Sequence, residues 1–165
     1  MLKNNRKNLE IIGANTFVSI EGVNDIPAKI DTGADSSSVH VENLSVSEDG
    51  ILSFELFGKK IERKDFKAVV VRSSNGDEEV RYRAPLSMKI GSKKIKAFFT
   101  LSNREKNDFP ALIGRKTIKN KFIVDVSERE VPLKKHLRSK HLNHELQKDP
   151  YKFHQKYIKS NEKEK

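Results

Sequence analysis

The chain has 165 residues, which is enough for one compact domain with a charged extension. It contains no cysteine, and this excludes a disulfide framework, a thiolate zinc site and a cysteine nucleophile. Its formal net charge is +10. About +6 of that charge lies in residues 129–165, so the excess is concentrated near the C-terminal end.

A basic extension of this kind is compatible with several partners. Clustered Lys and Arg bind nucleic-acid phosphates or acidic proteins, and a charge run is also the normal composition of a solvated face. The N-terminal arm, residues 1–9, lacks the apolar core of a secretory signal, and no segment is long and apolar enough to span a membrane. We therefore expect a cytoplasmic protein without membrane contact.

Residues 10–128 carry short apolar runs rich in β-branched and aromatic residues. In chain order the runs are FVSI (17–20), ILSFELF (51–57), AVVV (68–71), MKI (88–90), AFFTL (97–101) and FIVDV (122–126). Asn, Gly, Asp and Ser separate them, and short runs bounded by such turn residues are typical of strands. This region is therefore predicted to be all-β, as a barrel or a sandwich.

The clearest turn signal is the pair Asn75-Gly76, because a type I′ hairpin turn needs positive φ at two successive residues. It predicts a long hairpin over residues 69–86 with its tip at 73–77. Further turns are predicted at residues 48–50 and 90–94. One short helix is expected in the β region, at Gly114–Asn120 (GRKTIKN).

The composition changes after Val131-Pro132, and residues 129–165 are predicted to form a basic C-terminal tail. Leucines recur there at near-helical spacing, which predicts one or two weak amphipathic helices. Asp149-Pro150 should interrupt them, because the residue before a proline avoids the α region.

The stretch AKIDTGADSSSVH, residues 28–40, places an Asp-Thr-Gly triplet directly after an alternating apolar strand. Gly33 allows a sharp turn, and Asp31 and Thr32 can hydrogen-bond to nearby backbone amides. Such a loop holds a carboxylate at a strand end, as a general acid or base requires. The same residue types are also ordinary turn formers, so the triplet alone leaves both interpretations open.

A second motif, FPALIGRKTI at residues 109–118, follows about eighty residues later. With the predicted hairpin between them, the two motifs have the order and spacing of the retropepsins, homodimeric aspartic proteases best known from retroviruses. The resemblance spans residues 17–126. AKIDTGA, VVRSSNG and LIGR also resemble a bacterial family described as ATP-dependent zinc proteases. That family has a retropepsin-like fold, and its members are linked to the ligase that adds glutamates to a small-subunit ribosomal protein.

The resemblance implies a closed retropepsin-like barrel and assigns roles by position. Asp31 matches the catalytic aspartate, and Thr32 and Gly33 complete the triplet that fixes its loop. Three residues match structural positions near the site: Asp35, Gly114 and Arg115. Five match the tip of the flap that covers bound peptide: Arg72, Ser73, Ser74, Asn75 and Gly76. This flap has fewer glycines than the viral ones, and Asp35 stands where we expect Lys or Arg in the bacterial family.

Aspartic peptidase chemistry needs two carboxylates that share one proton. This chain has a single Asp-Thr-Gly, so the resemblance implies a homodimer that brings Asp31 against its symmetry mate. It also implies a peptide substrate, with the acidic or glutamylated tail of a ribosomal protein as the leading class, and a link to the glutamate ligase. Two alternatives remain: a non-catalytic peptide-binding module of the same fold, and a ribosome- or RNA-associating protein that acts through its basic tail.

The arginines of the predicted hairpin suggest a substrate preference. Arg72 precedes the predicted flap tip, and Arg81 and Arg83 lie on the returning strand, so a groove lined by guanidinium groups would hold a Glu-rich peptide by bidentate pairing. Arg81 and Arg83 share one strand face, however, and facing water is the plainer interpretation.

No cofactor is expected, and zinc is suggested by the family description alone. The sequence has no HExxH motif, and His40, the only histidine of the β region, is expected to be a half-exposed strand residue. A solvated basic helix explains the tail histidines more simply than a metal site. These are His136, His141, His144 and His154. There is no Walker loop, so any ATP dependence would come from a partner.

Overall fold

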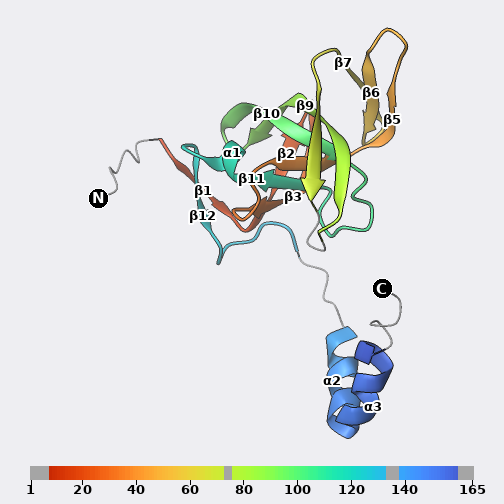
Figure 1. Ribbon diagram of the computed structural model, residues 1–165. Coiled ribbons are helices and arrows are strands. Elements are labelled where there is room, and N and C mark those ends of the chain that lie inside the picture. The colour runs from red at the N-terminus through yellow and green to blue at the C-terminus, as the bar shows by residue number, and fades with distance from the viewer. Residues whose placement is uncertain (1–7, 73–75, 133–137, 160–165) are drawn as a thin grey trace. The chain divides into compact units, whose positions relative to one another are not determined.

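The computed structural model describes residues 8–72, 76–132 and 138–159 (Figure 1). The chain divides into two compact units, residues 1–132 and 133–165. The first is built almost entirely from strands. In chain order its elements are β1 (Glu10–Gly13), β2 (Asn15–Ile20), β3 (Val23–Asp31), β4 (Ser37–His40), β5 (Glu42–Val46), β6 (Leu52–Leu56), β7 (Lys59–Arg63), β8 (Lys67–Arg72), β9 (Glu78–Ile90), β10 (Lys93–Ser102), β11 (Ala111–Gly114), α1 (Arg115–Ile118) and β12 (Phe122–Asp125).

Six of these strands form a closed barrel. They are hydrogen-bonded in the order β10-β4-β11-β3-β2-β9, and antiparallel pairing of β9 with β10 closes the ring. The predicted all-β class and closed barrel are confirmed, as is the short helix, which occupies four residues of the predicted segment. β8 pairs with the outer part of β9 and extends the sheet beyond the barrel.

Every second side chain of a barrel strand points into the interior. Ile26, Ala28 and Ile30 of β3 point inward and are at most 6% exposed. They belong to one core cluster with apolar side chains of the other barrel strands: Val18, Ile20, Val39, Leu86, Phe99, Leu101 and Ile113. Burying each large aliphatic or aromatic side chain contributes about 1.5–3 kcal/mol. The odd-numbered residues at the end of β3, including Asp31, are therefore left on the outer face.

The predicted hairpin is formed by β8 and β9, which pair antiparallel from Lys67 opposite Arg83 to Arg72 opposite Glu78. Gly76 has φ +91°, a left-handed conformation that glycine adopts without steric cost. The predicted tip residues Ser73, Ser74 and Asn75 lie outside the described part of the chain.

Two smaller sheets complete this unit. Strands β5, β6 and β7 form an antiparallel meander, and the turn predicted at residues 48–50 connects its first two strands. β1 pairs parallel with β12, so the start of the domain lies beside the strand that follows α1 (Figure 1). The buried Asn15 exchanges two hydrogen bonds with the backbone of Val131, at 2.8 and 3.0 Å, and this fixes the chain just before Pro132.

The second unit is helical where it is described. It contains α2 (Arg138–Lys148), α3 (Pro150–His154) and a π-helical turn (Gln155–Lys159). The break falls at Asp149-Pro150 as predicted, and the Asp149 carboxylate caps α3 by accepting from the Lys152 amide at 2.9 Å. None of the described helices is long and apolar enough to cross a membrane.

Candidate active site

Asp31 is the last residue of β3, and the loop that follows holds its carboxylate. Oδ1 accepts hydrogen bonds from the amides of Gly33 at 3.0 Å and Ala34 at 3.2 Å. No described residue bonds Oδ2. The side chain is half-buried, whereas Thr32 and Gly33 are exposed. One carboxylate oxygen is thus fixed by the protein, and the other remains available for a ligand.

Strand β11 supports this loop from the side. Gly114 lies opposite Asp31 in the parallel pairing of β11 with β3. A Cβ atom at position 114 would lie 2.5 Å from the carbonyl oxygen of Ser36, so only glycine allows the two segments to approach this closely. The Gly114 amide also donates to the buried Ser37 hydroxyl at 3.1 Å, and that hydroxyl is 2.8 Å from Thr117 Oγ1.

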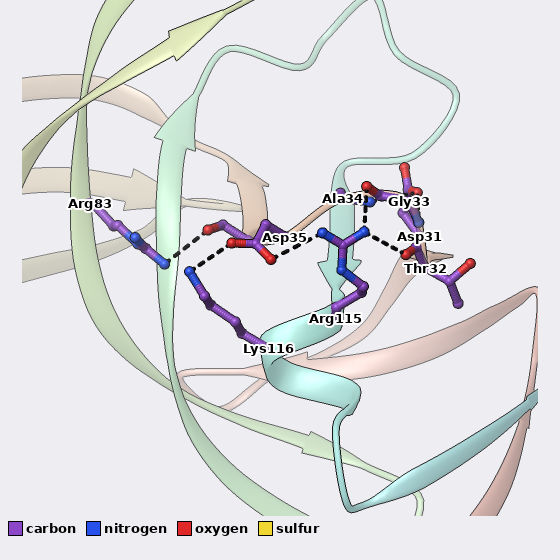
Figure 2. A network of polar contacts seen from close by, with 9 residues as sticks. Asp31, Thr32, Gly33, Ala34, Asp35, Arg83, Arg115 and Lys116 are labelled. Carbon is purple, nitrogen blue, oxygen red and sulfur yellow. Dashed lines mark hydrogen bonds and ion pairs between the residues drawn. The ribbon is translucent and has the colours of Figure 1, made fainter.

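Arg115 ties the loop to helix α1. Its Nη1 donates to the carbonyls of Thr32 at 3.1 Å and Gly33 at 3.0 Å, and its Nη2 contacts Asp35 Oδ1 at 3.1 Å. Figure 2 shows this guanidinium between the backbone of the Asp31 loop and the Asp35 carboxylate. Lys116 reaches the other Asp35 oxygen at 2.8 Å. These two cations lower the pKa of Asp35, with the Lys116 hydrogen bond the larger cause.

The hairpin arginines do not lie on one face. Strand alternation places Arg72 on the face opposite Arg81 and Arg83, so the three do not line one groove. Arg72 is exposed and bonds Glu78, its cross-strand neighbour. Arg81 bonds Glu79 of its own strand.

Arg83 is turned toward the segment that follows Asp31. Its Nη2 donates to Ser36 Oγ at 3.0 Å (Figure 2). Its guanidinium carbon lies 5.7 Å from the ring centroid of Phe98. The hairpin face that carries Arg81 and Arg83 is therefore the one nearest the Asp31 loop.

Arg104 was not singled out from the sequence, and the fold brings it to β4, the strand that follows the Asp31 loop. Its backbone amide donates to His40 Nδ1 at 2.9 Å, and its side chain reaches Ser38 Oγ at 3.1 Å. Its only sequence signal was a charged residue in a polar loop after a predicted strand, which does not distinguish it from a solvated arginine.

The histidine expected to be a half-exposed strand residue is half-buried, and its ring is engaged. His40 Nδ1 accepts from Arg104, and Nε2 lies 3.6 Å from Glu42 Oε1. Within the described ranges there is no group of three or more His, Asp or Glu side chains that could hold a metal ion. The donor set around Asp31 thus does not fit a zinc site, and we assign no step of the chemistry to a metal.

A closed six-stranded barrel that carries an Asp-Thr-Gly loop braced by a Gly-Arg pair has the architecture of the retropepsin-like proteins. Residues 11–135 match the family described as "RimB-like: Retropepsin-like aspartic endopeptidase RimB". The chain belongs to this family.

Curated relatives match most of the chain. Two proteins named "Probable alpha-L-glutamate ligase" match about seven tenths of the chain. The one from Shewanella pealeana is 33% identical over 131 residues (72% of this chain, 29% of that protein). The one from Desulfotalea psychrophila is 30% identical over 129 residues (70% and 28%). The chain thus spans less than a third of the length of these curated relatives.

The chain is also similar to solved structures. The crystal structure of Lpg0085 from Legionella pneumophila, a protein described as having unknown function, has a TM-score of 0.51 and 24% identity, and the match covers 72% of this chain and 95% of that one. The EIAV protease complexed with the inhibitor HBY-793 has a TM-score of 0.40 and 14% identity, with 80% and 100% covered.

Proposed function

We propose that the protein is an aspartic peptidase that acts as a homodimer, with one Asp31 carboxylate contributed by each copy. The observation that carries the proposal is the fixed Asp31 loop, in which Oδ1 is held by two amides while Oδ2 has no described partner. A carboxylate held in this way on the outer face of a barrel is suited to meet a second carboxylate across a two-fold axis.

The chemistry follows from two like charges at short range. Carboxylates about 3 Å apart do not both ionise, so the pair holds one proton. The ionised member takes a proton from a water molecule, whose oxygen attacks the scissile carbonyl carbon. The protonated member donates to the carbonyl oxygen, and proton transfer to the leaving nitrogen completes cleavage of the C–N bond. Arg115 would act as a positioning residue, because it binds the loop backbone and not the reacting atoms.

An exposed apolar surface supports association with a second copy. Ile11 of β1 and Ile123 of β12 lie opposite each other in the parallel pair and are 70% and 39% exposed. Val126, just beyond β12, is exposed as well. Apolar side chains gathered on a two-stranded sheet are better explained by a partner than by contact with water.

For the substrate, we propose the acidic or glutamylated tail of a ribosomal protein. The names of the two relatives support an association with glutamate ligation, since the matched region is part of proteins named as glutamate ligases. The cations around the site fit the same class of peptide, because guanidinium and ammonium groups bind carboxylates. One of them is Arg83, which bonds Ser36 just after the loop and forms no ion pair with a carboxylate of a described residue.

Mixing active and inactive copies tests the proposal. Asp31→Asn should lower cleavage of a glutamate-tailed peptide at least about 100-fold, because it removes a proton-transfer group. In mixtures equilibrated at fixed total concentration, only dimers with two wild-type copies have a complete site. The cleavage rate should then be proportional to the square of the wild-type fraction. An equal mixture should then retain about a quarter of the wild-type rate. Product formation is followed by mass spectrometry.

Three results would count against it. Cleavage that survives Asp31→Asn excludes Asp31 as a catalytic residue. A linear dependence on wild-type fraction excludes a shared site. Peptide binding without hydrolysis by either protein identifies the alternative, a non-catalytic binding module of the same fold.

A further inference from the structure

Arg104 is half-buried, and only some of its side-chain N–H donors form hydrogen bonds with described residues. Its Nε donates to the Phe109 carbonyl at 3.2 Å, and its Nη1 donates to Ser38 Oγ at 3.1 Å. A guanidinium has five N–H donors, so three remain unassigned. Arg104 forms no ion pair with a carboxylate of any described residue. The arginines that do are Arg63, Arg72, Arg81 and Arg115.

Strand register places Arg104 beside the face that carries Asp31. Asp31 lies opposite Gly114, and two residues earlier in β11 Leu112 lies opposite Ser38 of β4. Residues two apart point to the same side of a sheet, so Asp31 and Ser38 both belong to the outer face of the barrel. The residues between them fill the interior: Ile30, Val39 and Ile113. Two strand residues span about 7 Å, so Ser38, which Arg104 bonds, lies that far along the strands from the Asp31–Gly114 pair, one strand from Gly114 and two strands from Asp31.

The electrostatic environment of Arg104 agrees with this position. Its pKa is lowered, first by burial and then by the Arg81 guanidinium, while the Asp31 carboxylate acts in the opposite direction. Arg104 is thus within electrostatic range of both residues. Arginine stays charged at neutral pH despite such a shift. A partly desolvated cation beside a second cation is stabilised by an additional anion.

We propose that Arg104 is a specificity-determining residue that binds a carboxylate of the peptide one or two residues from the scissile bond. Arg81, which is paired with Glu79, adds a second guanidinium on the hairpin face turned toward the loop. The inference rests on the proposed function, because that function places the peptide over Asp31. An extended peptide advances about 3.3 Å per residue, so two residues cover the displacement of about 7 Å along the strands between Asp31 and Ser38, and the side chains of Arg104 and of the bound Glu reach toward each other across the strands. The carboxylate is either a Glu or Asp side chain or a C-terminal α-carboxylate.

Binding to the full-length Asp31→Asn protein tests the assignment without requiring turnover. The probes are fluorescent peptides that differ only in Glu or Gln at one position, each with a free or an amidated C-terminus. Anisotropy should show the Glu peptide bound about 10- to 100-fold more tightly than the Gln peptide, the range expected for hydrogen bonds between charged groups. A preference for the free over the amidated terminus identifies the α-carboxylate as the ligand instead.

The same preference should depend on Arg104. Arg104→Gln should remove the Glu-over-Gln discrimination, and Arg104→Lys should keep only part of it because lysine lacks the bidentate fork. Lys94→Gln is the matched control, since it removes one exposed cation of β10 and should leave the discrimination unchanged.

The possible results separate this inference from the proposed function. Equal affinity for all four peptides, or no binding, overturns the inference. An Arg104→Gln protein that loses affinity for every peptide by the same factor also overturns it, because that pattern reflects only the bonds to Phe109 and Ser38. If discrimination depends on Arg104 but the wild type never cleaves, the carboxylate site stands and the peptidase proposal fails.

Discussion

Asp31 is positioned by backbone groups. Two amides of its own loop bind one oxygen, and Arg115 holds two carbonyls of the same loop. An arginine that binds carbonyls braces the loop without directly pairing with the Asp31 carboxylate. The ion pairs of Asp35 with Arg115 and Lys116 are exposed and add little stability of their own, so the geometry of the loop matters more than its charge balance.

Gly114 is the residue where this geometry is most sensitive. Gly114→Ala should destabilise the protein by about 1–3 kcal/mol, because the new Cβ would lie 2.5 Å from the Ser36 carbonyl and force the backbone to shift. Gly33→Ala is the matched control, since its Cβ would meet only the Asp31 side chain, at 3.2 Å. Denaturant unfolding compares the two. Equal losses would mean that the close approach at Gly114 is not what constrains the site.

The sequence predicted the Asp31 loop better than its surroundings. The triplet, Gly114 and Arg115 were found because they form two short motifs whose residue types are informative. Arg104 was missed because its position depends on register: β4 lies between β10 and β11, and neither pairing is visible in the sequence of Arg104 itself. Arg72 was wrongly grouped with Arg81 and Arg83, since the hairpin register that separates their faces was not known.

At the scale of elements, local signals predicted local structure. Asn75-Gly76 predicted the hairpin of β8 and β9, and the Asp149-Pro150 break separates α2 from α3. The closure of the barrel and the parallel contacts of β3 with β11 and β4 with β10 join distant parts of the chain. Short apolar runs allow a barrel or a sandwich equally, so only the resemblance favoured the barrel before the pairings were known.

One cross-strand pair on the barrel surface places two like charges side by side, which lowers the free energy of unfolding. Lys94 of β10 lies directly opposite Lys89 of β9, and both are exposed without an ion pair among the described residues. Lys94→Glu should stabilise the protein by about 0.2–1 kcal/mol, because it replaces like charges with opposite ones. Lys96→Glu makes the same charge change opposite Ser87 and is the control. Thermal unfolding at low salt should separate them, and an equal shift in both would show that only net charge matters.

At the scale of the whole molecule, the β1–β12 sheet is the surface on which the proposed dimer depends. It joins the first strand of the barrel unit to the strand that follows α1, so it is connected through Arg115 and Gly114 to the Asp31 loop. A second copy that packs on Ile11 and Ile123 would contact a strand that is joined through α1 to the residues bracing the Asp31 loop.

Ile123→Glu should therefore prevent dimer formation and abolish cleavage while leaving the fold intact, because it places a charge in an apolar contact. Sedimentation velocity measures the association state, and circular dichroism measures the fold. Leu44→Glu is the control, since Leu44 has similar exposure, 41%, on the separate meander. A dimeric Ile123→Glu protein would show that another surface brings the copies together.

The two hydrogen bonds between Asn15 and Val131 indicate where the chain can be shortened. They join the first residue of β2 to Val131, which directly precedes Pro132. A protein shortened to end at Pro132 keeps both hydrogen bonds. The activity of the barrel unit can therefore be measured without the basic tail. RNA binding that disappears in the shortened protein, with peptide cleavage retained, would assign the two properties to different parts of one chain.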